Sequence, residues 1–172
     1  KNKGKTTGWI GYTLSKTTKY FDEINDGTAF PAKYDRRHDL SITCTHELSK
    51  SWVLSGVFVY ATGNSITLPT ERYVIGGNVY TEFTSRNGFR MEPYHRLDIG
   101  ATYTPKKKKK FESSWNFSIY NVYSRKNPYF IYFDLEAPEG KNGRIEELNL
   151  TPKAYQVSIF PILPSITWNF SF

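Results

Sequence analysis

Two clusters of charged residues are the stretches of this sequence whose residue types could do chemistry. Residues 35–38 read DRRH and residues 95–98 read HRLD, so each cluster combines a carboxylate, a histidine and arginine. A hydrolase would need a serine, a histidine and an acid at one site, and a metal would need ligands that converge from fixed positions. The three histidines of the chain offer no such spacing. We therefore expect no enzymatic activity, no metal site and no cofactor, and we interpret both clusters as charge pairing at the ends of strands.

A long polar segment, residues 69–93, holds the better candidates for contact with a substrate. Its aromatic rings can stack on sugar rings or other planar groups, and its guanidinium groups can bind carboxylates through two hydrogen bonds. The candidate substrate-binding residues are Arg72, Tyr73, Tyr80, Phe83, Arg86 and Arg90. The alternative is a solvated loop that covers the strands beneath it and does not bind a substrate.

The final residues, 165–172 (SITWNFSF), show what kind of element positions these groups. Ile166, Trp168, Phe170 and Phe172 fall on one face of a strand, and small polar residues fall on the other, because strand side chains alternate between faces. An apolar face that ends in aromatic residues is typical of a transmembrane β-strand, where lipid covers that face.

The same alternation predicts six strands with turn-forming residues between them. We expect strands at residues 7–21, at 38–48, at 52–67, from 96 to 104, from about 114, and from about 155 to 172. A bulge is expected near residues 120–123, where the alternation changes phase. The outward face of the third strand stays open, because large apolar residues occupy one phase and valines the other. Residues 47, 98 and 116 are expected on the inward, polar face.

The predicted connections fall into two length classes. Those after the second and fourth strands (residues 49–51 and 105–112) are short, whereas residues 22–33, 69–93 and 134–152 form long ones. Outer-membrane barrels have short periplasmic turns and long extracellular loops in this same alternation. The expected fold is thus an all-β, antiparallel transmembrane barrel segment in one domain, residues 1–172, with its C-terminus in the periplasm.

Composition excludes several other classes of protein. No apolar run approaches the roughly 20 residues of a membrane helix. The net charge is +7, but the lysines at 106–110 supply five of these charges, so we do not expect nucleic-acid binding. Cys44 is the only cysteine, which excludes a disulfide framework and favours a small residue of the barrel wall.

Six strands are too few for a closed transmembrane barrel, for which about eight is the smallest number. An open sheet edge in lipid would leave backbone N–H and C=O groups unpaired, each at a cost of several kcal/mol. The sequence also opens without a secretory signal. We therefore expect this chain to be the C-terminal fragment of a larger barrel.

Several short motifs occur in a characteristic order along nearly the whole chain. They are TGWIGYTLS (7–15), YDRRHDL (34–40), YATGN (60–64), NGFRM (87–91), YHRLD (94–98), SIYNVY (118–123), NPY (127–129) and the terminal Phe172. Together they resemble the C-terminal part of TonB-dependent outer-membrane receptors of the Bacteroidetes.

That resemblance implies a barrel of about 22 strands around an N-terminal plug, with this chain as roughly its last six strands. It implies import of a large or scarce solute of the siderophore, cobalamin, glycan or peptide class. The implied partners are the rest of the barrel, the plug, the TonB complex, outer-membrane lipid and lipopolysaccharide, with a surface lipoprotein as a further candidate. The barrel-assembly machinery is expected to read Trp168, Phe170 and Phe172.

Two alternatives remain. One is a passive porin or a surface-binding barrel without a plug, which the sequence upstream of Lys1 would distinguish. The other is a soluble, secreted β-sandwich, in which the two apolar faces would pack on each other. Partitioning into detergent separates this second alternative from both barrels.

Overall fold

The protein was analysed as a computed structural model, which describes residues 2–75, 78–83, 85–106, 111–136 and 151–171. These residues form fifteen strands and one short 3-10 turn, η1 (Asn25–Gly27). The predicted all-β, antiparallel fold is confirmed. No helix among the described residues is long and apolar enough to span a membrane.

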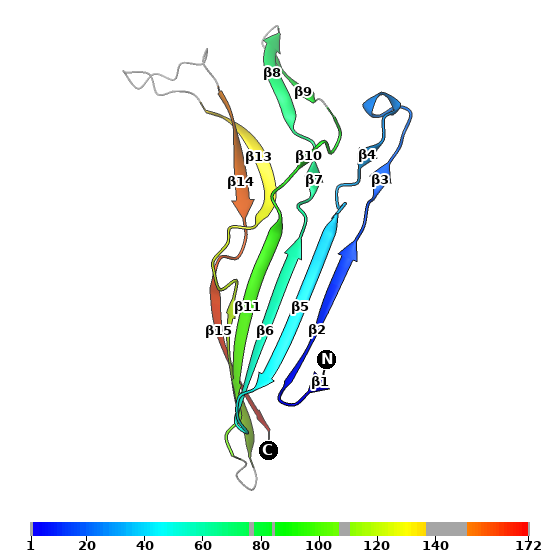
Figure 1. Ribbon diagram of the computed structural model, residues 1–172. Helices are drawn as coiled ribbons and strands as arrows, with labels where there is room; N and C mark the ends of the chain where they lie inside the picture. Colours follow the sequence, from blue (N-terminus) through cyan, green and yellow to red (C-terminus); the bar gives the residue numbers. More distant parts are fainter. Residues whose placement is uncertain (1, 76–77, 84, 107–110, 137–150, 172) are drawn as a thin grey trace, which may run out of the picture.

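One large antiparallel sheet dominates the structure (Figure 1). Its strands follow the order β1 (Asn2–Lys3), β2 (Thr6–Leu14), β5 (His38–Glu47), β6 (Trp52–Ala61), β11 (Tyr94–Tyr103), β12 (Glu112–Tyr120) and β15 (Leu163–Ser171). Apart from β1, each strand is nine or ten residues long. The sheet is open: β1 and β2 lie at one side, β15 lies at the other, and they do not pair with each other.

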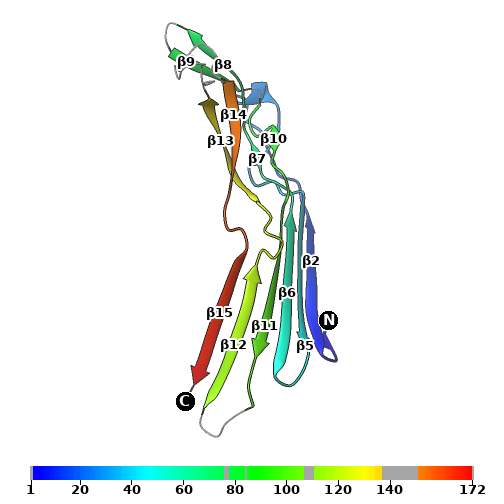
Figure 2. The same cartoon turned by 90° about the vertical axis from the view of Figure 1, so that its left-hand side faces the viewer.

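Four two-stranded ribbons continue from one end of this sheet, which we call the loop side (Figures 1 and 2). They pair β3 (Thr18–Lys19) with β4 (Phe30–Pro31), β7 (Ser65–Ile66) with β10 (Phe89–Arg90), β8 (Pro69–Ile75) with β9 (Asn78–Phe83), and β13 (Pro128–Glu136) with β14 (Thr151–Ser158).

The predicted alternation of connection lengths is confirmed. Residues 48–51 join β5 to β6, and β11 ends and β12 begins at the same end of the sheet, opposite the loop side, which we call the turn side (Figure 1). The three long connections span residues 15–37, 62–93 and 121–162, and their described residues lie on the loop side. Most of the lysine run, residues 107–110, lies outside the described residues.

Two predicted strands are shorter in the structure because backbone groups bond elsewhere. The first strand, expected to reach residue 21, stops at Leu14, and the N–H of Thr17 donates to the carboxylate of Asp35 instead of to a ladder. The third, expected to reach residue 67, stops at Ala61. At Gly63 the chain passes so close to Met91 that an added Cβ would lie 1.9 Å from its carbonyl oxygen.

Two segments expected to be polar loops contain strands instead. Residues 69–93 include the hairpin β8–β9 and the short strand β10. The expected loop at 134–152 is bordered by β13, which runs to Glu136, and by β14, which begins at Thr151. Polar composition misled the prediction here, because a ribbon with both faces in solvent needs no apolar alternation.

β12 ends at Tyr120 in a turn, and the extra residue expected near residues 120–123 is Asn121. The register of β11 and β12 would place Asn121 opposite Leu97, but it is the N–H of Val122 that donates to Leu97 O, so the pairing shifts by one residue as in a bulge. Asn121 and Ser124 both adopt positive φ angles, 53° and 52°. Asparagine tolerates this left-handed conformation better than most residues. The Asn121 side chain also holds the turn, since its Oδ1 accepts from Arg125 N–H and its Nδ2 donates to Arg125 O and Phe160 O.

The expected sixth strand is two strands in different sheets. β14 ends at Ser158 and β15 begins at Leu163, and between them Phe160 has a φ of 54°. Pro161 inside this break and Pro164 at the start of β15 have no N–H donor for a ladder. The chain therefore passes from one sheet to another within the stretch expected to be a single strand.

Side chains are buried only at the loop side of the sheet and in the long connections. The buried apolar residues are Phe30, Ala32, Ala61 and Met91, and the buried polar ones are Asp35, Ser65, Asn121 and Asn127. The middle and the turn side of the sheet hold no fully buried residue among those the structure describes. The sheet therefore has no apolar core of its own.

Candidate functional site

The strand register divides the sheet into two chemically different faces. Residues directly opposite each other in adjacent strands share a face. Ile10 lies opposite Ile42, Ile42 opposite Phe58, and Phe58 opposite Leu97. Continuing this rule across the sheet defines an apolar face and a polar face.

The large side chains of the apolar face come from all six long strands. They are Ile10, Tyr12, Leu14, Leu40, Ile42, Trp52, Leu54, Phe58, Tyr60, Leu97, Ile99, Tyr103, Trp115, Phe117, Ile119, Ile166, Trp168 and Phe170. The open question about the third strand is thereby answered, because its large apolar residues lie on this face and its valines lie on the other.

Aromatic rings and histidines gather at the loop-side end of the apolar face. Tyr12 Oη lies 2.8 Å from His38 Nδ1, and their rings stack. Tyr60 stacks on His95, and His95 Nδ1 lies 2.8 Å from the hydroxyl of Tyr123. We call these five residues the loop-side belt.

A second aromatic group occupies the opposite end of the same face. The ring of Trp52 lies 4.9 Å from that of Tyr103, measured between centroids. Trp115 stacks on Trp168 at 5.6 Å, and Phe170 lies 4.7 Å from Trp168. We call these five residues the turn-side belt. Its members come from four strands, so the belt is a feature of the sheet rather than of one strand.

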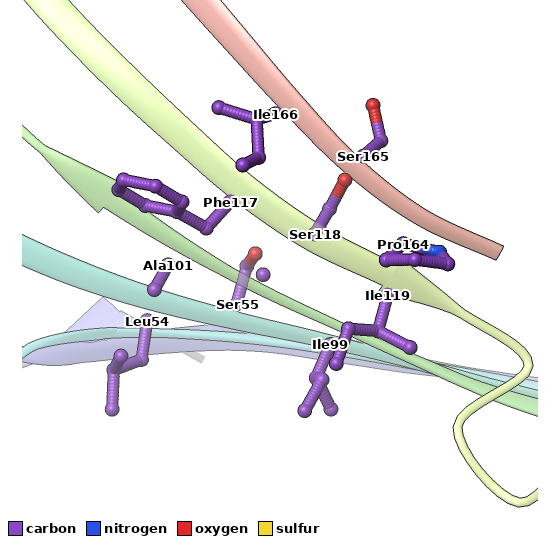
Figure 3. Close-up of a pocket in the computed structure, with 11 residues that line it drawn as sticks. Leu54, Ser55, Ile99, Ala101, Phe117, Ser118, Ile119, Pro164, Ser165 and Ile166 are labelled. Atoms are coloured by element: carbon purple, nitrogen blue, oxygen red, sulfur yellow. The ribbon is translucent and has the colours of Figure 1, made fainter.

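Mainly aliphatic side chains fill the band between the two belts. Ile10 is 72% exposed and Ile166 is 67% exposed, so solvent reaches most of each side chain. A hollow of about 520 Å³ lies in this band. Leu54, Ile99, Phe117 and Ile166 are among the residues that line it (Figure 3). Leu54 and Ile99 point to the side of the ribbon opposite Ser55 and Ser118 (Figure 3).

The polar face carries hydroxyl, amide and charged groups. Glu47, Asp98 and Asn116, which were predicted to share a face, all lie on it. Asn116 Nδ2 donates to the Thr102 hydroxyl at 2.9 Å. The apolar exceptions on this face are Trp9, Val53, Val57, Val59, Ala61 and Leu163.

Arg96 organises the loop-side end of the polar face. Its Nε lies 2.9 Å from the Asp98 carboxylate, and its Nη1 donates to the hydroxyls of Tyr94 and Tyr120. Its guanidinium carbon lies 4.0 Å from the Tyr120 ring centroid, which is a cation–π contact. Asp98 also accepts the N–H of Asn121, so the strand end and the following turn share one network.

The predicted cluster at residues 35–38 is split between interior and surface. Asp35 is 2% exposed and receives hydrogen bonds from Thr17 N–H and from Arg90, at 2.6 and 2.7 Å. Burial raises the pKa of its carboxyl, but these two hydrogen bonds and the Arg90 charge outweigh burial and lower the pKa. Arg36 and Asp39, in contrast, form a half-exposed pair at 3.7 Å.

Several side chains join the long connections to one another or to the large sheet. Arg90 also donates to the carbonyls of Asp35 and Gly63, and Asn87 Nδ2 donates to Pro31 O. These bonds join the first connection to the second. Asn127 joins the third connection to β11, since it bonds both the N–H and the C=O of His95.

The six predicted substrate-binding residues do not form one cluster. Tyr80 and Phe83 are exposed in β9 at the tip of the second connection, and Arg90 lies in β10 at its base (Figure 1). Arg86 donates its backbone N–H to Asn25. Arg72 and Tyr73 lie in β8, where side chains are outside the described part. The role of all six residues in binding a substrate stays a prediction.

Two of the three predicted assembly-signal residues, Trp168 and Phe170, belong to the turn-side belt, each about half exposed. Phe172 lies outside the described residues. Their recognition by an assembly machinery also stays a prediction.

The described residues contain no group of three or more histidine, cysteine, aspartate or glutamate side chains that could hold a metal ion. No family model, no curated protein and no solved structure matches this chain.

Proposed function

We propose that this sheet is part of the wall of an outer-membrane β-barrel, with its apolar face toward lipid and its polar face toward the lumen. The observation that carries the proposal is the apolar face with an aromatic belt at each end. Outer-membrane barrels present an outward apolar band about 25 Å tall between two aromatic girdles. A large, continuous and exposed apolar face is rare on soluble monomers.

Strand length supports the same proposal. A transmembrane β-strand needs about 9–11 residues when it is tilted by about 45°. The six long strands have nine or ten residues each. Specific side-chain bonds hold the chain where it leaves the strands at the loop side, as at Thr17 and Asn121.

The open sides of the sheet require further strands under this proposal. In lipid, the two outer sides of the sheet would face hydrocarbon, and any backbone group left unpaired there would cost several kcal/mol. We infer that strands outside residues 1–172 pair with both sides and close the barrel.

The resemblance to TonB-dependent receptors supports a more specific function. We propose that the barrel imports a large or scarce solute across the outer membrane with energy from the TonB complex, and that this segment performs no chemistry. The long connections then face the outside, and the turns at residues 48–51 and 104–111 face the periplasm.

Cysteine labelling tests the proposal through its sidedness. In the full-length protein with Cys44→Ser, we expect Glu82→Cys in β9 to react with a membrane-impermeant maleimide on intact cells. Lys50→Cys, in the turn between β5 and β6, should react only after the outer membrane is permeabilised. Labelling of both sites on intact cells, or of Lys50→Cys alone, would contradict the barrel wall.

A second measurement tests the transport step. Deletion of the TonB complex should abolish uptake of the solute while surface labelling at residue 82 is unchanged. Uptake that persists without the TonB complex would contradict the importer and favour a passive porin.

A further inference from the structure

A second hollow, of about 530 Å³, lies at the loop side of the polar face. Its walls come from several segments far apart in the sequence: residues 33, 34 and 36, Asn64, the ends of β11 and β12, residues 127–130, and residues 159–160. This volume lies within the range of small-molecule sites, which is about 300–1,000 Å³. None of the six predicted substrate-binding residues lines it.

Aromatic rings make up much of the wall. Tyr94 and Tyr120 lie side by side on adjacent strands, and Arg96 holds both hydroxyls in place. Phe160 meets the Tyr120 ring edge-on at 6.4 Å, in the segment where β14 passes into β15. Tyr129 and Phe130 form another edge-on pair at the start of β13, and Tyr129 is 63% exposed. Such fixed ring faces are suited to stacking against a flat or pyranose ring.

The charged groups of the hollow have one sign. Lys33 and Arg36 line it, and no aspartate or glutamate does. Lys33 Nζ lies 5.5 Å from the centroid of the Tyr34 ring. The Arg36–Asp39 pair is long and half exposed, so it contributes little and leaves the guanidinium able to turn toward a ligand. These two cations would attract a carboxylate, and arginine can bind it through two parallel hydrogen bonds.

Asn64 adds an unused acceptor at the wall. Its side-chain Oδ1 is buried and has no hydrogen-bond partner among the described residues. Most buried polar atoms in proteins are hydrogen-bonded, and an orphan costs about 1–3 kcal/mol. A hydroxyl group brought to this wall by a ligand would satisfy it after a small rotation of the amide.

We propose that this hollow binds an acidic saccharide, with a pyranose ring on the tyrosine faces and its carboxylate at Lys33 and Arg36. A neutral sugar would use only the rings, and a planar aromatic acid without hydroxyl groups would leave the Asn64 acceptor unpaired. This inference adds a ligand class to the proposed function. It rests on the proposed function for the position of the hollow, inside the barrel below its outer mouth.

Calorimetric titration of the full-length protein in detergent with digalacturonate, an acidic disaccharide, tests the proposal. We expect saturable binding that the neutral disaccharide digalactose does not match. Lys33→Gln together with Arg36→Gln should weaken digalacturonate binding at least tenfold and leave digalactose binding unchanged. Tyr129→Ala should weaken the binding of both sugars. Lys16→Gln and Tyr20→Ala, which alter exposed residues outside the hollow, are the matched controls.

Equal affinity for the two sugars, or binding that the double glutamine variant does not change, would overturn the saccharide site. So would an absence of binding by the unaltered protein. The cysteine labelling described above is independent of this titration. If labelling follows the expected sidedness and the titration fails, only the binding site is wrong; if the labelling is reversed, the barrel itself is wrong.

Discussion

The sheet and the loop side of this protein are held together in different ways. The sheet depends on backbone ladders between long strands, and its side chains remain half exposed on both faces. Among the residues that the structure describes, the buried side chains lie at the loop side, and half of them are polar: Asp35, Ser65, Asn121 and Asn127. Its connections are joined by side chains that bond backbone groups of distant segments.

This difference shows where each region finds its stability. A sheet without an apolar core must bury its faces against something outside itself, and we propose lipid on one side and the lumen on the other. The loop side brings its own polar interior and can keep its shape in water. A substitution should therefore act on membrane insertion in the first region and on local order in the second.

The largest expected effect tests whether the two faces of the sheet have different surroundings. An arginine is placed on each face of one strand in turn. Ile42→Arg puts a cation between Ile10 and Phe58, in the aliphatic band. We expect a loss of about 2–4 kcal/mol in unfolding free energy in lipid vesicles, the cost of arginine near the bilayer midplane. Ser41→Arg, between Gly11 and Val59 on the polar face, should cost less than about 1 kcal/mol. Equal losses in urea titrations would remove the distinction between the faces.

The next largest effect should come from the buried ion pair of the loop side. Arg90→Ala leaves the Asp35 carboxylate buried without its partner, which typically costs about 3–5 kcal/mol. Because the Arg90 side chain is 32% exposed, we expect the lower part of that range or less, about 2–3 kcal/mol.

The stability lost in Arg90→Ala should be confined to the loop side. Hydrogen exchange should accelerate at Thr17 and Met91 but not in the middle of β5 or β6. Arg36→Ala, which removes an exposed pair, is the control and should change exchange hardly at all. Faster exchange throughout the sheet would show that the two regions are not independent.

Lowering the pH should reproduce part of the loss of protection expected for Arg90→Ala. The pKa of Asp35 is lower in the folded protein than in the unfolded chain, so its carboxylate stabilises the fold above the unfolded pKa of about 3.9. That contribution is lost as the pH falls through the lowered, folded pKa. We expect protection at Thr17 to decline as the pH falls below about 3.9, and Asp35→Asn to lack this decline. A profile that is identical in both proteins would assign the acid sensitivity to another group.

The smallest effect should be on assembly at the turn-side belt. Phe170→Ser removes an apolar side chain that is only half buried, worth about 1 kcal/mol of burial. The finished barrel should tolerate this loss, whereas less protein should reach the outer membrane. Ser171→Thr on the polar face is the control and should be silent. Quantitative blotting of outer-membrane fractions measures the amount of each variant. An amount of Phe170→Ser equal to that of the unaltered protein would contradict a role for the turn-side belt in assembly.

The sequence predicted the sheet well because alternation is a local signal. Leu40, Ile42 and Cys44 alternate with serine and threonine, and that pattern alone gave the face of β5 correctly. Turn residues likewise gave the right order of long and short connections. The outward face of β6 could not be predicted, because both phases are apolar; only the register against β5 and β11 decides it.

The predictions failed where distant residues determine the local structure. Nothing near Thr17 indicates that its N–H will bond Asp35, and nothing near Gly63 indicates the close approach of Met91. β13 had a usable signal, since residues 129–133 are aromatic or apolar throughout, but the neighbouring polar residues obscured it. The hollow at Tyr94 and Tyr120 has no motif, because its walls come from separate segments.

One feature of the apolar face has a practical consequence for spectroscopy. Cys44, the only cysteine in the sequence, is exposed in the middle of β5, and its direct neighbours across the two ladders are Gly8 and Gly56. Glycines on both sides leave room for a nitroxide, so the unaltered protein accepts a spin label at the centre of this face. Collision rates of that label with oxygen, which dissolves in hydrocarbon, and with a water-soluble nickel chelate would then report the immersion depth of the strand.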